Sequence, residues 1–179
     1  MEQYTLDKKL IENSQYGRLS AVKEAIKKGA NVHADDDCAL YLAVLYNYPE
    51  VVKVLVKNDA NIHVKNDLAL RWAAQNGCLD VVKLLVESGA DIHAKNNAAL
   101  RLAARFGRLK VVKFLLKNDA DIHADDNDAL RSAAVNGHLD VIKVLVKNGA
   151  NIHAKNDFAL EWAAEYGRLD VVNYLKSIK

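Results

Sequence analysis

Five histidines recur at a constant spacing, and imidazole is the commonest metal ligand in proteins. They lie 30 residues apart, at His33, His63, His93, His123 and His153. A zinc ion holds each ligand nitrogen at about 2.0–2.1 Å, whereas helices packed side by side lie about 8–10 Å apart. Histidines in neighbouring structural units therefore cannot share one ion, although aspartates after His33 and His123 leave a looser surface site open. We expect turn residues with a structural role, no metal and no cofactor.

Arginines recur with the same period and could recognise negative charge. They are Arg71, Arg101 and Arg131, with Tyr41 and Glu161 at the equivalent positions towards the two ends. A row of guanidinium groups could bind phosphate, nucleic acid or an acidic partner. Alternatively, each arginine closes a local hydrogen bond with the Asp or Asn four residues before it. We favour the local bond, because a net charge of only +2 makes nucleic acid an improbable partner.

Residues for catalysis, secretion or membrane insertion do not form any recognised pattern. The sequence has no glycine-rich phosphate loop and no nucleophile in a known strained turn. Cys38 and Cys78 are too few for a disulfide framework and indicate reduced thiols. No apolar run approaches the roughly 20 residues of a membrane span, and no apolar leader precedes a cleavage site. We expect an intracellular protein that is not an enzyme and does not enter a membrane.

The elements that position these residues are copies of one 30-residue unit. The segment Ala-Asn/Asp-Val/Ile-His begins at residues 30, 60, 90, 120 and 150, without insertion or deletion. Such a period indicates a repeat array. We therefore predict one domain over residues 1–179, divided into an N-terminal capping unit, four repeats and a C-terminal capping repeat: 1–30, 31–60, 61–90, 91–120, 121–150 and 151–179.

Each copy is expected to form a turn followed by two short helices. In the third repeat, residues 91–97 are polar and suit a turn with Asn97 as the N-cap of a helix over 98–105. Gly107 suits the left-handed conformation that ends this helix. Residues 109–117 predict a second helix, with Val and Leu on one side and Lys on the other.

Two short helices cannot bury their apolar sides alone, so the copies must stack side by side. Alanines recur on the first helix, for example Ala99 and Ala103, and let neighbouring helices approach closely. The ends carry charge where inner copies are apolar, as at Lys8 and Lys176. Polar end faces keep such an array from polymerising. We predict an all-α solenoid of stacked helix-turn-helix units that is complete and monomeric.

The units resemble ankyrin repeats. The segment Ala98–Ala104 (AALRLAA) stands where that family has T-P-L-H-x-A-A, and Gly137–Ile142 (GHLDVI) resembles the start of its second helix. The period is 30 instead of the usual 33, and this shortened, histidine-containing form resembles ankyrin proteins of giant DNA viruses. The resemblance implies a protein–protein interaction module that grips a partner, such as a host protein in the host cytoplasm or nucleus, with the concave face lined by its first helices.

The positions that vary between copies cluster on the first helix and its exit, where the resemblance places the binding face. One varying position holds Leu42, Trp72, Leu102, Ser132 and Trp162, and a change from Trp to Ser is unusual for a purely structural site. Trp and Tyr also dominate interface hot spots. The candidate partner-binding residues are Tyr41, Leu45, Tyr46, Arg71, Trp72, Gln75, Arg101, Arg105, Phe106, Arg131, Val135, Trp162, Glu165 and Tyr166.

Other interpretations remain open. The two tryptophans could fill gaps between units instead of contacting a partner. The arginines could bind acidic polymers or nucleic acid. The strong similarity between the copies is also compatible with an engineered, consensus-like scaffold that has no dedicated partner.

Overall fold

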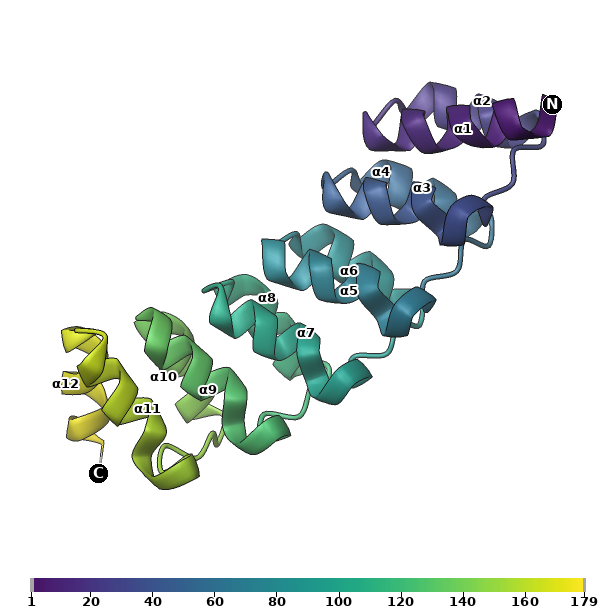
Figure 1. Ribbon diagram of the computed structural model, residues 1–179. Helices are drawn as coiled ribbons and strands as arrows, with labels where there is room; N and C mark the ends of the chain where they lie inside the picture. Colours follow the sequence, from purple (N-terminus) through teal and green to yellow (C-terminus); the bar gives the residue numbers. More distant parts are fainter. Residues whose placement is uncertain (1, 179) are drawn as a thin grey trace. The chain divides into compact units, whose positions relative to one another are not determined.

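The computed structural model describes residues 2–178, which form twelve α-helices and, within that range, no strand (Figure 1). The helices are α1 (Glu2–Gln15), α2 (Leu19–Lys27), α3 (Ala34–Leu45), α4 (Pro49–Lys57), α5 (Val64–Asn76), α6 (Leu79–Glu87), α7 (Ala94–Arg105), α8 (Leu109–Lys117), α9 (Ala124–Asn136), α10 (Leu139–Lys147), α11 (Ala154–Glu165) and α12 (Leu169–Ser177). Each 30-residue copy thus supplies one pair of helices, which confirms the predicted all-α class.

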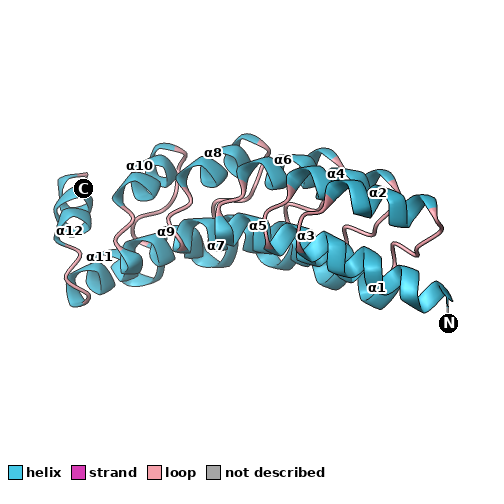
Figure 2. Cartoon of the chain, turned by 90° about the horizontal axis from the view of Figure 1, so that it is seen from above, coloured by secondary structure: helices cyan, strands magenta, loops and turns pink. Residues whose placement is uncertain are grey.

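The chain divides into two compact units. The first comprises Met1–Ala73 and Cys78–Asp91, and the second comprises Ala74–Gly77 and Ile92–Lys179. Within the first unit α1 packs on α3 and α2 on α4; within the second, α7 packs on α9, α9 on α11 and α8 on α10. In each unit the odd-numbered helices form one row and the even-numbered helices another (Figure 2). We call the exposed side of the odd-numbered row the first-helix face.

The second helices follow the sequence pattern closely. The observed α8, Leu109–Lys117, has the predicted bounds. Val111, Val112 and Leu115 are buried, whereas its three lysines are exposed. The two adjacent valines and the leucine three residues later lie on one side of a helix. The second helix is therefore held by burial of this apolar side between the two rows.

The first helices are held by small side chains. Ala99, Ala103 and Ala104 are at most 1% exposed, and Leu100 is fully buried. Gly107, with φ 68°, ends α7 in the left-handed conformation. Its N–H donates to Ala104 and the next N–H donates to Ala103, at 3.1 and 2.8 Å. These bonds satisfy carbonyl groups at the helix end, so the predicted glycine stop is confirmed.

The turn before each first helix differs from the prediction. Lys95, Asn96 and Asn97 all have left-handed backbone angles, with φ between 52° and 55°, and the same triplet recurs in every copy from Asp35–Asp37 onward. A capping residue normally has extended angles and accepts a bond from the helix. The buried Asn97 side chain instead accepts from His93 and from the following repeat. Its prediction as an N-cap was wrong.

Both ends of the chain carry the expected polar faces. Lys8, Lys9 and Glu12 are exposed on α1, while Leu10 of the same helix is fully buried. Lys176 is exposed on α12. Charged residues are thus exposed on α1 and α12, together with Tyr4 and Leu169, which are 71% and 70% exposed. The capping role of the two ends stays a prediction.

Candidate functional site

The recurring histidines belong to the junctions between repeats. His33 Nδ1 donates to Asp37 Oδ1 at 3.1 Å, and the same oxygen accepts the backbone N–H of Asn61, in the next repeat, at 2.7 Å. The equivalent pairs are His63 with Asp67, His93 with Asn97, His123 with Asn127, and His153 with Asp157. The imidazoles of His33, His63, His93 and His123 thus orient an oxygen that holds the following repeat, which is a structural role as predicted for the turn.

The N-terminal unit contains the same junction in a form that the sequence analysis missed. Asp7 Oδ1 accepts the backbone N–H of Asn31 at 2.7 Å, and Gln3 donates to Asp7 in place of a histidine. Both residues lie on the helix α1, so no turn motif marks them. The available signal was the period itself, because Gln3 and Asp7 stand 30 residues before His33 and Asp37.

The recurring arginines bind the left-handed turn of their own repeat. Arg71 donates to the carbonyl groups of Lys65 and Asn66 at 2.7 and 3.2 Å. Arg131 donates in the same way to Asp125 and Asp126, at 2.9 and 3.1 Å. For Arg71 and Arg131 the interaction is local, as we favoured, but the acceptors are main-chain carbonyl groups and not the Asp or Asn side chain four residues earlier. Arg101 instead makes its shortest bonds to Asp128 and Asp125 of the next repeat, at 2.8 and 3.1 Å. Arg101 also donates to the carbonyl group of its turn, at Lys95.

A second set of bonds joins neighbouring repeats at the exit of the first helix. In the second unit, Arg108 and Arg168 donate to the carbonyl groups of Gln75 and Val135 at 2.9 Å. His138 Nε2 donates to the Arg105 carbonyl at 3.0 Å. The donors Arg108, His138 and Arg168 were not predicted from the sequence, because Arg, His, Tyr and Cys alternate at this position and hide the pattern.

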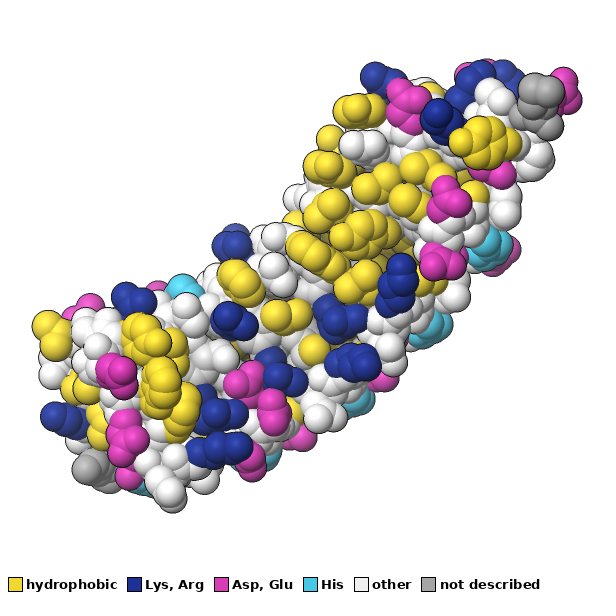
Figure 3. All heavy atoms as spheres, viewed as in Figure 1, with side chains coloured by type: hydrophobic (Ala, Val, Ile, Leu, Met, Phe, Trp, Pro, Cys, Tyr) yellow, Lys and Arg dark blue, Asp and Glu magenta, His cyan; other side chains and the backbone are white. Residues whose placement is uncertain are grey.

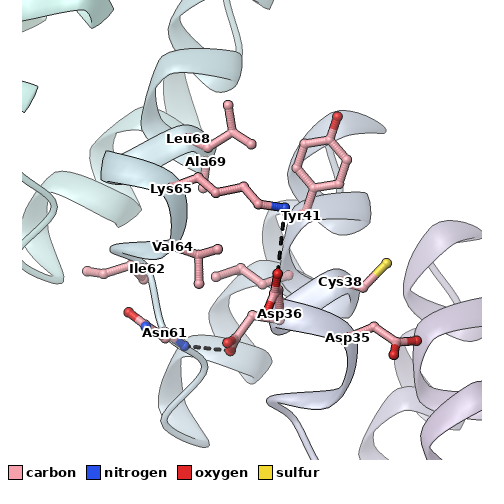
Figure 4. Close-up of a pocket in the computed structure, with 12 residues that line it drawn as sticks. Asp35, Asp36, Cys38, Tyr41, Asn61, Ile62, Val64, Lys65, Leu68 and Ala69 are labelled. Carbon is pink, nitrogen blue, oxygen red and sulfur yellow. Dashed lines mark hydrogen bonds and ion pairs between the residues drawn. The ribbon is translucent and has the colours of Figure 1, made fainter. Parts of the chain in front are cut away.

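On the first unit, apolar side chains form the first-helix face. Figure 3 shows them gathered over α3 and α5. The rings of Tyr41 and Trp72 meet edge to face, with centroids 6.3 Å apart. Next to them, between the start of α3 and the start of α5, lies a cavity of about 280 Å³ (Figure 4). Its wall includes Cys38, where burial, and to a lesser degree the charge of Asp35, raises the pKa of the thiol.

On the second unit, the face combines ion pairs with a stack of aromatic rings. Figure 3 shows charged side chains over α7 and α9 and hydrophobic ones over α11. Trp162 stacks between Phe158 and Tyr166, with centroid distances of 5.0 and 5.6 Å. Arg131 lies 5.1 Å above the Phe158 ring. A cavity of about 270 Å³ between α9 and α11 is lined by Trp162, Arg131, Val135 and Arg105, among others.

The fourteen candidate residues are all at least partly exposed. The structure brings together Tyr41 with Trp72 in the first unit, and Arg105, Arg131, Val135 and Trp162 in the second. Two more candidates contact the second group, because Tyr166 stacks on Trp162 and Arg105 lies over the Phe106 ring. The others lie on first helices or directly after them, outside these two groups: Leu45, Tyr46, Arg71, Gln75, Arg101 and Glu165.

Exposed aromatic residues recur at one position of the repeat, directly after the first helix. Tyr16, Tyr46, Phe106 and Tyr166 are 40–54% exposed, and they account for four of the six large hydrophobic residues exposed among residues 2–178. Because they contribute little to the core, packing alone does not explain them. Tyr16 was missed because the opening segment was treated only as a cap.

The described part of the chain shows no metal cluster or membrane span. Across residues 2–178, no group of three or more His, Cys, Asp or Glu side chains is arranged to hold a metal ion. Within the same range, no helix is both long enough and apolar enough to cross a membrane. Cys38 and Cys78 are both free thiols.

Comparison with known proteins identifies the repeat. A family model of ankyrin repeats in three copies matches residues 10–96, 65–126 and 100–179. Among solved structures, the chain is similar to the human ASB11 ankyrin repeat domain, with a TM-score of 0.85 and 25% sequence identity. That alignment covers 94% of this chain and 82% of the other. No curated protein matches the chain.

Proposed function

Because the chain belongs to the ankyrin repeat family, we propose that it is a non-catalytic module that binds a partner protein through its first-helix face. The observation that carries this proposal is the exposed aromatic residues directly after first helices in each unit, Tyr16 and Tyr46 in the first and Phe106 and Tyr166 in the second. Exposed aromatic side chains are enriched at protein interfaces, because they bury much area at a low entropic cost.

The second interpretation, an acidic polymer held by the arginines, has less support. The guanidinium groups of Arg71 and Arg131 already bind carbonyl groups of their own turns, and Arg101 is paired with Asp125 and Asp128. Their donors are therefore largely used within the chain. Five further points are predictions from the sequence alone: the viral origin, the host partner, the intracellular location, the single-domain organisation and the monomeric state.

The experiment is to capture partner proteins with the tagged chain and to measure their affinity for point variants. Trp72→Ala tests the face of the first unit, and Arg105→Ala tests that of the second. Each variant should weaken binding at least about tenfold, or ~1.4 kcal/mol, as expected for aromatic and arginine anchors. Lys113→Ala, on the exposed side of α8, is the control and should change affinity little.

Thermal unfolding of every variant must accompany the binding measurement, because Trp72 also contacts Tyr41. If Trp72→Ala lowers stability while the folded fraction binds normally, the tryptophan is structural. If Lys113→Ala weakens binding and Arg105→Ala does not, the second helices form the contact surface and the proposal is wrong.

A further inference from the structure

Arginines extend into the grooves between successive first helices of the second unit. Arg101 extends from α7 to α9, where its Nε donates to Asp128 at 2.8 Å and its guanidinium pairs with Asp125 at 3.1 Å. Arg131 of α9 lies over the ring of Phe158 of α11. In this unit, each groove therefore holds the guanidinium group of the repeat that precedes it.

The groove between α3 and α5 of the first unit has different residues at the same positions. Tyr41 replaces Arg101, while Lys65 and Leu68 replace its two aspartate partners. The space left open is the cavity of about 280 Å³, and Figure 4 shows Tyr41 and Leu68 on either side of it. This groove thus lacks the arginine of both second-unit grooves, and it lacks the two aspartates of the groove between α7 and α9.

The left-handed turn beside the cavity also lacks its arginine. Arg71 and Arg131 each donate two hydrogen bonds to carbonyl groups of the corresponding turn in their own repeats. Tyr41 stands at the arginine position of this repeat, so the repeat has no arginine there to donate to the equivalent carbonyl groups of Asp35 and Asp36. Two carbonyl groups at the mouth of the cavity thus lack the arginine from which the equivalent groups accept in the repeats of Arg71 and Arg131.

The charges around this mouth favour a cation. Asp35, Asp36 and Asp37 all line the cavity. The Asp36 carboxylate faces Lys65, whereas Figure 4 shows that of Asp35 directed away. The Asp37 carboxylate is buried and accepts from His33 and from the Asn61 N–H. Lys65 reaches Asp36 at 3.7 Å (Figure 4), but both side chains are largely exposed. An exposed pair of this kind contributes little and is easily displaced. Three carboxylates against one lysine leave the site negative.

We propose that this groove binds an arginine side chain of the partner protein, which supplies the guanidinium that this repeat does not provide itself. The inference rests on the proposed function and specifies the chemistry of the partner. The aliphatic part of the arginine packs between Tyr41 and Leu68, and the guanidinium donates to the Asp35 and Asp36 carbonyl groups and to the Asp36 carboxylate in place of Lys65. Arginine fits better than lysine, because its planar fork donates several bonds in fixed directions.

The test uses N-acetyl-arginine amide as the probe and nuclear magnetic resonance of the isotope-labelled full chain as the readout. Saturable shifts are expected at the amides of Cys38, Tyr41 and Leu68. N-acetyl-citrulline amide has the same shape without the charge, and should bind at least about tenfold more weakly, since charge-assisted bonds are roughly twice as strong as neutral ones. Equal binding of the two probes, or no saturable shift with arginine, would overturn the proposal.

Two variants locate the site. Tyr41→Arg places an arginine where the inner repeats have one, so it should fill the groove and abolish binding of the probe. Glu161→Arg makes the same change at the equivalent position of the last repeat and should leave binding unchanged. If Tyr41→Arg does not fold, the double variant Asp35→Asn, Asp36→Asn tests the site instead. Its affinity for the arginine probe should be lower by about fivefold or more. Probe binding that survives these changes contradicts the assignment.

The probe experiment needs no partner, so its failure is distinct from failure of the proposed function. If the arginine probe does not bind while Trp72→Ala still weakens the binding of a captured partner protein, the groove proposal is wrong. The proposal that the first-helix face binds a partner is then retained. If the probe binds the groove but no captured protein depends on the first-helix face, the proposed function is wrong and the arginine site stands.

Discussion

At the scale of single residues, one side-chain oxygen joins each repeat to the next. Asp67 is buried, and its Oδ1 accepts from His63 in its own turn and from the backbone N–H of Asp91 at 2.9 Å. Asn97 and Asn127 make the same two bonds in the second unit. Since Asp and Asn both occur, the junction requires a hydrogen-bond acceptor and not a negative charge.

This requirement gives a prediction for Asp67. Asp67→Ala removes the acceptor and should lower the free energy of unfolding by about 1–3 kcal/mol, the usual cost of leaving buried groups without a partner. Asp67→Asn keeps an oxygen in place and should cost clearly less. Urea unfolding followed by circular dichroism measures both. Equal losses in the two variants would show that the charge, and not the acceptor, matters.

The sequence could not reveal this junction. It marks the histidine and the Asp or Asn as recurring, and it suggests that Asn97 caps a helix. The acceptor role depends on three consecutive left-handed residues, including Lys95, which does not favour that conformation. Hydrogen bonds from Arg101 and from other repeats hold the turn there. Because these contacts come from other parts of the chain, the local sequence does not predict the left-handed conformation of the turn.

At the scale of the helices, glycine at the end of the first helix makes room for the next repeat. A Cβ at Gly107 would lie 2.7 Å from Nδ1 of His138, and one at Gly137 would lie 2.9 Å from Cδ of Arg168. Asn47 occupies the same position in the second copy, and there the next repeat presents the small Cys78. The residue at this position is thus small where the residue 31 positions later is large, and larger where that residue is small.

Two glycine variants separate this contact from backbone strain. Gly107 and Gly89 both have positive φ, at 68° and 97°, but a Cβ at Gly89 would meet nothing within 4 Å. Gly107→Ala should therefore lose more stability than Gly89→Ala, by about 1 kcal/mol or more, which is typical of overpacking. Thermal unfolding compares the two. Similar losses would indicate that only the backbone conformation counts.

The helices themselves were well predicted, because their signals are local. The bounds of α8 and the end of α7 follow from the apolar spacing and from Gly107. The candidate face was predicted from the variation between copies, and the structure places those residues at partly exposed positions. Which of them touch one another could not be predicted: the stack of Phe158, Trp162 and Tyr166 depends on ring orientations that spacing does not determine.

At the scale of the whole chain, each helix pair depends on its neighbours for burial. In the second unit, α11 packs on α9 and α12 on α10, and they cover Ile142 and Leu145, which are fully buried. The apolar sides of an inner repeat cannot face water without cost, since each large side chain contributes about 1.5–3 kcal/mol when buried. The last pair therefore protects the second unit.

Deleting residues 151–179 tests this dependence. The truncated chain should unfold at a lower temperature and self-associate, because it exposes the apolar side of α9 and α10 without the polar face of α12. Light scattering and thermal unfolding measure the two effects. A truncated chain that stays monomeric with unchanged stability would contradict the capping role of the last pair.

The oxygen that joins successive repeats also gives each junction its own spectroscopic reporter. The amide protons of Asn31, Asn61, Asp91, Asp121 and Asn151 are each held by a side chain of the preceding copy, outside any helix. Such a proton exchanges with solvent deuterium when its own junction opens, whereas protons inside helices report on the helices. Five exchange rates from one sample would therefore rank the junctions by their opening free energy, and show where along the chain separation begins.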